Sequence, residues 1–289
     1  MEPTGDRAAQ GGAVGSWALV VPMAALYLAL FAGPLLLLVA ASFLDESLGG
    51  PWRLTNWTRF LTDRYNLDSI LRTLKLGVTV VATTLLLAYP MALVARFGPR
   101  WVGKLMLLAA LLPFLTSVVV RSFAWIAILS REGALNGLLL ALGLVDEPLR
   151  LLLSETGVVL ALTQIETPLM LLPLIVTLRR IDDRLIDASE ALGASAWRTL
   201  VRVVVPMSLP GLLAGTVFVF SSAVTAFVSQ SIIGGSRIAY LTSVIYGRAM
   251  STFDWGMAST AALTLLLVAG IPVATALYLG GRAERAIYG

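Results

Sequence analysis

The sequence predicts an all-α, polytopic membrane protein with six transmembrane helices. Of its 289 residues, 58% are hydrophobic and 13% are charged, and the mean hydropathy is +0.87. An ordinary globular domain has about a quarter of its residues charged. The apolar residues gather in runs of roughly 20 or more, the length that a helix needs to cross a bilayer. Only helices and closed barrels bond every backbone group inside lipid, and these runs are too long for barrel strands.

The apolar runs predict the positions of the spans. They cover residues 17–43, 70–94, 105–129, 158–178, 209–228 and 258–279. The first run exceeds the apolar part of a signal peptide, which is about 7 to 15 residues, so we expect a retained helix. The chain then divides into an N-terminal tail (1–16), a transmembrane domain (17–280) and a C-terminal tail (281–289).

Basic residues near the span ends predict the orientation, because cytoplasmic loops collect lysine and arginine. With the N-terminus inside, the cytoplasmic segments would hold Arg7, Arg96, Arg100, Lys104, Arg179, Arg180, Arg184, Arg198, Arg202, Arg282 and Arg285. The opposite loops also carry arginines, but they are longer and contain acids such as Asp45 and Asp146. We therefore expect both termini in the cytoplasm. The apolar segment 133–144 is too short to span, and it fits either an interfacial helix or an ordinary loop helix.

Several kinds of chemistry are excluded by composition. The chain has no cysteine and no histidine, which removes disulfides, thiolate chemistry, imidazole acid–base catalysis and the commonest transition-metal ligands. It has no G-x4-G-K-[S/T] phosphate loop. We predict no catalytic residue, no metal site and no cofactor in this chain. The net charge of +4 fits cytoplasmic anchoring better than nucleic-acid binding.

The cytoplasmic segment 179–207 has the pattern of a helical hairpin. Residues 181–192 favour a short helix, Gly193 permits a sharp turn, and residues 194–205 favour a second helix that Pro206 ends. The second helix would place Trp197, Leu200 and Val201 on one side, with Arg198 and Arg202 beside them. Such a face suits docking into a groove.

This segment resembles the EAA loop of ABC importer permeases, whose pattern is E-A-A-x3-G-x9-I-x-L-P. The matching residues are Asp187, Ala188, Ser189, Gly193, Val203, Val205 and Pro206. Every spacing agrees, and four identities differ by conservative exchange: Asp for Glu, Ser for Ala, Val for Ile and Val for Leu. We call residues 179–208 the EAA loop.

Other segments are similar to the spermidine/putrescine-type permeases, which include opine carriers: residues 112–144, residues 222–235 and the pair Asp254 and Trp255. The resemblance covers about residues 17–280. It implies the type I ABC importer permease fold, and an inner-membrane permease subunit of a bacterial importer that forms half of the pathway for a polyamine, opine or similar solute. It also implies a cytoplasmic ATPase dimer that binds ATP and Mg, a second permease that is a different chain, and a periplasmic binding protein.

In that family the EAA loop sits in a cleft of the ATPase, so the resemblance assigns coupling to Asp187, Ala188, Ser189, Gly193 and Pro206. Trp197 and Arg198, on the predicted docking face, are the other coupling candidates. A pair of helices joined at a glycine, with an apolar side chain that fits into the partner, can transmit a domain movement. The alternative is a solvated hairpin without a partner.

Polar residues within the spans are candidates for the substrate pathway, because buried charge in a membrane is costly unless it is paired or wetted. Arg121 and Glu166 lie on neighbouring spans, where they could pair structurally or line the path. Gln164 and Thr167 flank Glu166, and we expect Pro168 to break the helix there. Gln230, at the end of the fifth span, is a weaker candidate.

The substrate and the pairing of permeases stay open at this stage. In polyamine carriers of this family, an acidic residue tends to occupy the segment where Ala226 stands, so a zwitterionic or anionic solute remains an alternative. A self-sufficient secondary transporter or channel is the alternative from another class, although the sequence shows no inverted repeat. A membrane hydrolase is a third possibility, without a clear nucleophile and base.

Overall fold

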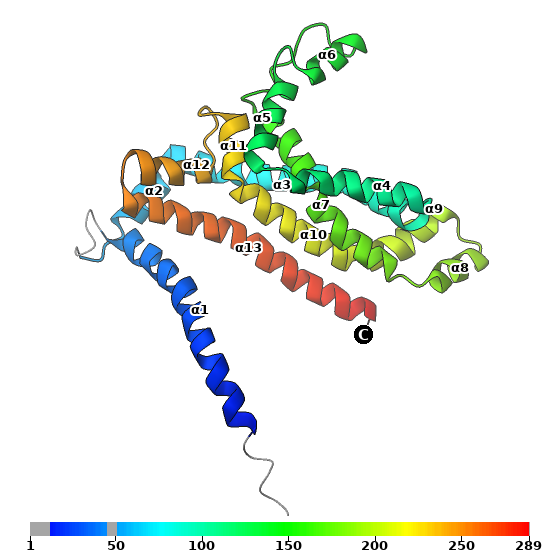
Figure 1. The fold of residues 1–289 in the computed structure, drawn as a ribbon, viewed down its shortest axis with the longest axis horizontal. Helices are drawn as coiled ribbons and strands as arrows, with labels where there is room; N and C mark the ends of the chain where they lie inside the picture. The colour runs from blue at the N-terminus through cyan, green and yellow to red at the C-terminus, as the bar shows by residue number, and fades with distance from the viewer. Residues whose placement is uncertain (1–11, 45–50, 289) are drawn as a thin grey trace, which may run out of the picture.

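The computed structural model describes residues 12–44 and 51–288, and this part of the chain is almost entirely helical (Figure 1). The helices are α1 (Gly12–Phe43), α2 (Thr55–Thr62), α3 (Arg64–Phe97), α4 (Arg100–Leu111), a 3-10 turn (Leu112–Leu115), α5 (Val118–Leu129), α6 (Ala134–Ala141), α7 (Glu155–Arg179), α8 (Asp183–Ala191), α9 (Ala196–Thr199), a π-helical segment (Leu200–Val204), α10 (Val205–Thr225), α11 (Phe227–Gly234), α12 (Leu241–Tyr246), a second π-helical segment (Gly247–Ser251) and α13 (Trp255–Tyr288). Within the described residues, six helical stretches are long and apolar enough to cross a membrane, which confirms the all-α, six-span prediction. The third stretch is Val118–Ala141, whereas the sequence predicted 105–129.

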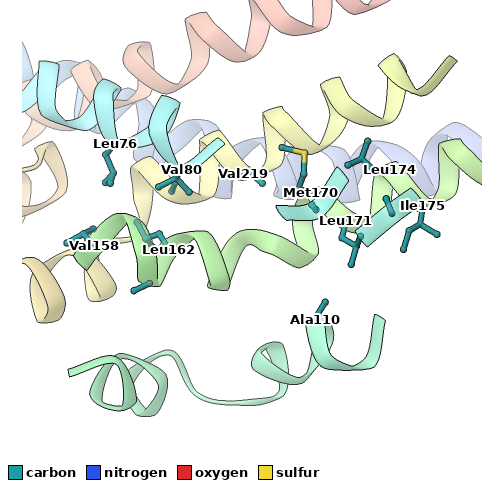
Figure 2. Packing of buried hydrophobic residues seen from close by; sticks show 14 of the residues in the cluster. Leu76, Val80, Ala110, Val158, Leu162, Met170, Leu171, Leu174, Ile175 and Val219 are labelled. Atoms are coloured by element: carbon teal, nitrogen blue, oxygen red, sulfur yellow. The ribbon is translucent and has the colours of Figure 1, made fainter. Parts of the chain in front are cut away.

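The core lies where α7 packs between α3, α10 and the α4–α5 segment. Figure 2 shows side chains of α7, such as Leu162 and Met170, directed toward Val80 of α3 and Val219 of α10. Two thirds (67%) of the apolar window of α7 is buried, a larger share than in any other of these stretches. α7 is therefore the central helix of the described bundle.

Two glycines allow α10 to lie directly on α7. A Cβ atom at Gly211 would stand 2.6 Å from the carbonyl oxygen of Pro173, and one at Gly215 would stand 3.2 Å from the Cα of Met170. Small residues one turn apart let membrane helices approach closely, because helix association in lipid depends on packing. The contact holds the helix before the EAA loop against the helix after it.

α1 leaves the bundle at an angle (Figure 1) and meets α13 and α2 near its C-terminal end. None of its apolar window is buried, so its surface needs lipid or another chain to cover it. α1 begins at Gly12, and α13 continues to Tyr288, so helix extends into both expected tails. Residues 1–11 and 289 lie outside the described part, as do Asp45 and Glu46.

Two expected spans are interrupted. The run 105–129 is divided into α4 and α5 by a 3-10 turn that begins Leu112-Pro113 and ends in extended backbone at Thr116. The run 209–228 is interrupted at Ala226, between α10 and α11. Hydropathy could not locate these breaks, because apolar residues continue through both. The apolar segment 133–144 forms α6, which stands off the bundle (Figure 1).

Two expected breaks at proline are wrong. α7 passes through Pro168 as a continuous helix. Just before the proline, the hydroxyl of Thr163 donates to the carbonyl of Val159 at 2.7 Å, and the hydroxyl of Thr167 donates to that of Thr163 at 2.6 Å. Pro206 does not end a helix either, since it lies in the first turn of α10. The π-helical segment just before it widens the helix and shifts the hydrogen-bond register, which removes the clash that proline has with the preceding turn.

Candidate functional site

The EAA loop folds as a bent pair of short helices at one end of the bundle (Figure 1). Asp182 caps the start of α8 by accepting a hydrogen bond from the backbone N–H of Arg184 at 3.0 Å. The predicted coupling residues are distributed along this hairpin, with Asp187, Ala188 and Ser189 on α8, Gly193 in the turn, Trp197 and Arg198 on α9, and Pro206 at the start of α10.

Gly193 makes the bend. Its φ is +80°, in the region where a residue with a Cβ costs about 1 to 2 kcal/mol. The N–H of Gly193 donates to the carbonyl of Glu190 at 2.8 Å, and the N–H of Ala194 donates to that of Ser189 at 3.1 Å. This pair of bonds is a Schellman cap, which ends α8 in one defined direction. The sharp turn predicted at Gly193 is therefore present, and two backbone hydrogen bonds define its direction.

The bend exposes large apolar side chains. Leu192 is 89% exposed and Trp197 is 72% exposed. Val201 is also exposed, but Leu200 packs against the core because the helix continues into α10. The predicted apolar face is thus divided, with Trp197 and Val201 outward and Leu200 inward. Ser189, Leu192, Ala194, Arg198 and Arg202 line a hollow of about 260 Å³ beside Trp197.

Two contacts that the sequence did not indicate hold the hairpin in place. The hydroxyls of Ser189 on α8 and buried Thr199 on α9 lie 2.9 Å apart, which joins the two helices. Arg96, at the end of α3, donates to the carbonyls of Leu178 at 3.1 Å and Ile181 at 3.3 Å. It also forms an ion pair with Asp183. Arg96 thus ties the end of α7 and the start of α8 to α3.

Glu166 is buried in the middle of α7, with 2% of its surface exposed. It accepts a hydrogen bond from the hydroxyl of Ser222 on α10 at 2.9 Å. Within the described residues it forms no ion pair, with Arg121 or any other cation. The possible pairing of Arg121 with Glu166 is therefore absent from this conformation. Thr167 bonds to the backbone of its own helix.

Arg121 lies in the first turn of α5, next to the interruption of the third span. One of its terminal nitrogens donates to the carbonyl of Thr116 at 3.3 Å. Its Nε atom is buried without a hydrogen-bond partner. One turn further along α5, the indole N–H of Trp125 donates to the side-chain oxygen of Gln164 at 3.3 Å. The polar residues of α5 and α7 thus share one interface.

Gln230 caps the interruption of the fifth span. Its amide nitrogen donates to the carbonyl of Ala223 at 2.7 Å, at the free end of α10, and its oxygen accepts from the hydroxyl of Thr242 at 2.5 Å. The first bond satisfies a backbone carbonyl near the break, and the second holds the Gln230 side chain in place. Gln230 therefore stabilises the broken helix in this conformation.

This arrangement, a bundle of membrane helices with a bent hairpin at one end and polar residues within, is that of a transport permease. A family model described as "Binding-protein-dependent transport system inner membrane component" matches residues 88–280. The chain belongs to that family. It is the permease component of an ABC importer, as its relatives are.

Curated relatives align over most of the chain. The spermidine/putrescine transport system permease protein PotB of Escherichia coli (strain K12) is 30% identical over 242 residues, covering 82% of this chain and 88% of PotB. The permease YdcU of the same organism is 30% identical over 236 residues, covering 77% and 74%. The putative 2-aminoethylphosphonate transport system permease PhnU of Salmonella typhimurium (strain LT2) is 29% identical over 239 residues, covering 81% and 82%.

Solved ABC importers share the fold at low identity. A chain of a bacterial importer of the acidic polysaccharide alginate superposes with a TM-score of 0.73 at 18% identity, covering 92% of this chain and 94% of that one. A chain of the MetNI methionine transporter superposes with a TM-score of 0.54 at 16% identity, covering 77% and 96%. The type I importer permease fold predicted from the sequence is confirmed.

Proposed function

We propose that this chain forms half of the translocation pathway for a small organic cation or zwitterion in a bacterial inner membrane. A separate ATPase subunit drives it by docking on the EAA loop. The observation that carries the proposal is the defined bend at Gly193, which holds exposed Leu192 and Trp197 at the end of the bundle. A largely exposed tryptophan on the helix that follows a defined turn suits insertion into a partner's groove.

The loop can transmit force because it is fastened to three helices. α8 follows α7 after a short turn, α9 runs into α10 through the π-helical segment, and Arg96 joins the hairpin to α3. A movement of the ATPase against Leu192 and Trp197 would therefore move α3, α7 and α10 together, as in rigid-body switching. ATP and Mg belong to the ATPase, since this chain has no phosphate loop.

The complex we propose contains an ATPase dimer, a second permease encoded by a different chain, and a periplasmic binding protein. The unburied apolar surface of α1 supports a second membrane chain as neighbour. Arginines on and around the EAA loop support its cytoplasmic location, and with it both termini in the cytoplasm.

The solute class follows from relatives and from Glu166. PotB belongs to a spermidine/putrescine system and PhnU to a putative 2-aminoethylphosphonate system, and each of these solutes carries an amine. Glu166, with Arg121, Gln164, Thr167 and Gln230 near the interrupted spans, is our candidate to meet that amine. A buried carboxylate without a cationic partner is suited to this task.

The coupling proposal is tested with Trp197→Ala and Gly193→Val in the assembled complex. Trp197→Ala should weaken ATPase binding by about 30-fold or more, because truncating a tryptophan at the centre of an interface costs about 2 kcal/mol or more of binding free energy. Gly193→Val should preserve ATPase binding better but reduce solute-stimulated ATP hydrolysis, because it redirects the bend. Co-purification and ATPase assays measure both.

Trp255→Ala is the matched control, since Trp255 is similarly exposed but begins α13, away from the EAA loop. It should leave ATPase binding unchanged. If Trp197→Ala binds the ATPase as well as this control and stays fully coupled, the proposal is refuted.

A further inference from the structure

A pocket lies between α3 and α7, at the end of the bundle opposite the EAA loop, and its mostly apolar wall carries several polar and charged side chains. It has a volume of about 310 Å³. Its position follows from α7, which starts at the pocket with Glu155 and leads into the EAA loop after Arg179. The polar residues that matter are Arg72, Lys75, Thr79, Thr83, Glu155 and Tyr240.

One of the residues that line the pocket, Tyr240, has a buried hydroxyl without a partner. Tyr240 is 1% exposed, and its OH group has no hydrogen-bond partner. The backbone is fixed here, because the N–H of Leu241 donates to the hydroxyl of Thr73 at 3.0 Å. An unpaired buried hydroxyl costs free energy and indicates a missing partner. Burial raises the pKa of Tyr240, and the nearby Glu155 carboxylate raises it further, so the hydroxyl keeps its proton and can donate.

The charged groups of the pocket sum to one positive charge. Lys75 forms an ion pair with Glu155 at 2.8 Å, from Nζ to Oε2. Arg72 forms no ion pair with any residue that the structure describes. Its guanidinium and the Tyr240 hydroxyl are therefore donors without an ion-pair or hydrogen-bond partner among these lining residues. With Lys75 neutralised by Glu155, the unpaired guanidinium and a neutral donor favour an anionic group, and guanidinium matches carboxylate and phosphonate geometry.

Hydroxyl groups connect the pocket to the interior. Thr83 lines the pocket, and its hydroxyl lies 2.6 Å from that of Thr163 on α7. Thr163 is one turn before Glu166. At about 1.5 Å per residue, Glu155 and Glu166 are about 16 Å apart along α7. Thr83 and Thr163 thus form a short row of hydroxyl groups from the pocket toward Glu166.

We propose that this pocket is a binding subsite for the anionic group, carboxylate or phosphonate, of a small zwitterionic solute entering the pathway. Arg72 and Tyr240 bind the anionic group, and Glu155 faces its amine. The inference rests on the proposed import function and narrows its solute class, because a polyamine has no anionic group and would meet net positive charge.

The test uses cysteine protection in the assembled complex. Because the chain has no cysteine, Thr79→Cys places a single thiol in the pocket, and Ser236→Cys places one on an exposed loop as control. A small water-soluble thiol reagent is applied with 2-aminoethylphosphonate or putrescine as probe. The phosphonate should slow labelling of Thr79→Cys in a saturable manner, whereas putrescine should not, and neither should affect Ser236→Cys.

Adding Tyr240→Phe to Thr79→Cys should raise the half-protecting phosphonate concentration by about tenfold or more, the usual effect of losing a hydrogen bond to a charged group. The lost hydroxyl has no partner, so the complex should keep its thermal stability; Arg72→Gln is a second variant with the same expected loss of protection. The inference would be overturned if Thr79→Cys did not react, if neither probe protected it, or if putrescine protected it as well as the phosphonate. Full protection by the phosphonate with Tyr240→Phe and with Arg72→Gln would also overturn it. Labelling needs no ATP hydrolysis, so failure of ATPase docking on the EAA loop would be seen separately.

Discussion

Arg96→Met should loosen the EAA loop while leaving the membrane bundle assembled. Arg96 is largely shielded, with 17% of its side chain exposed, and it donates to two backbone carbonyls at the junction of α7 and α8. Each such charged hydrogen bond contributes about 1.5 kcal/mol. Its ion pair with Asp183, whose side chain is 72% exposed, adds at most about 1 kcal/mol. The loss of the carbonyl bonds alone is about 3 kcal/mol, or about 100-fold in the local opening equilibrium.

Hydrogen exchange measures this opening directly. Backbone amides of residues 181–193 should exchange about 100-fold faster in Arg96→Met, and solute-stimulated ATP hydrolysis should fall while basal hydrolysis remains. Asp183→Asn is the matched control, because it removes the ion pair and keeps the carbonyl bonds. It should change exchange by about fivefold or less.

Equal exchange rates in Arg96→Met and Asp183→Asn would refute this reasoning. If Arg96→Met exchanges no faster than Asp183→Asn, the carbonyl bonds do not hold the loop. If both variants keep solute-stimulated ATP hydrolysis, the contacts between α3 and the hairpin are not needed for coupling.

Two further predictions concern the interior. Gly211→Ala should destabilise the complex by about 1 to 3 kcal/mol, because its Cβ would stand 2.6 Å from the Pro173 carbonyl oxygen, the usual cost of overpacking. Gly270→Ala, with nothing within 4 Å of its Cβ, should be neutral or slightly stabilising, and a lower thermal midpoint for both would contradict the packing argument. Glu166→Gln should reduce transport of an amine-bearing solute more than it reduces assembly. Glu166→Gln removes the charge but keeps a side-chain oxygen that can accept from Ser222, whereas Ser222→Ala removes the hydrogen bond and keeps the carboxylate. An equal transport loss in both variants would show that the charge alone does not account for the loss.

Local patterns in the sequence determined much of this protein. The apolar runs predicted the spans because a helix in lipid needs a minimum length of apolar residues. The spacing from Asp187 to Pro206 predicted the EAA loop, and Gly193 predicted its bend, because only the residues of the turn itself decide its backbone conformation. The family, the fold class and the importer function followed from these patterns.

Local rules failed where distant segments share hydrogen bonds. Pro168 and Pro206 were expected to break helices, yet each lies within a continuous helix, because packing and a widened turn accommodate a proline that would end an isolated helix. The interruption at Ala226 is stabilised because Gln230 donates to a carbonyl at the end of α10 and Thr242 donates to the side-chain oxygen of Gln230. The sequence contains both residues but does not show that they meet.

The same limit applies to the candidate sites. The sequence by itself identified Glu166, Arg121 and the loop residues as polar or exposed groups in need of partners. Only the tertiary structure decided the partners, by giving Glu166 a hydrogen bond from Ser222 and no direct ion pair with Arg121, by joining Arg96 to the hairpin and by placing Tyr240 beside Arg72 and Glu155. Composition and spacing act along the chain, whereas hydrogen bonds, charge pairing and pockets depend on how helices far apart in sequence pack together.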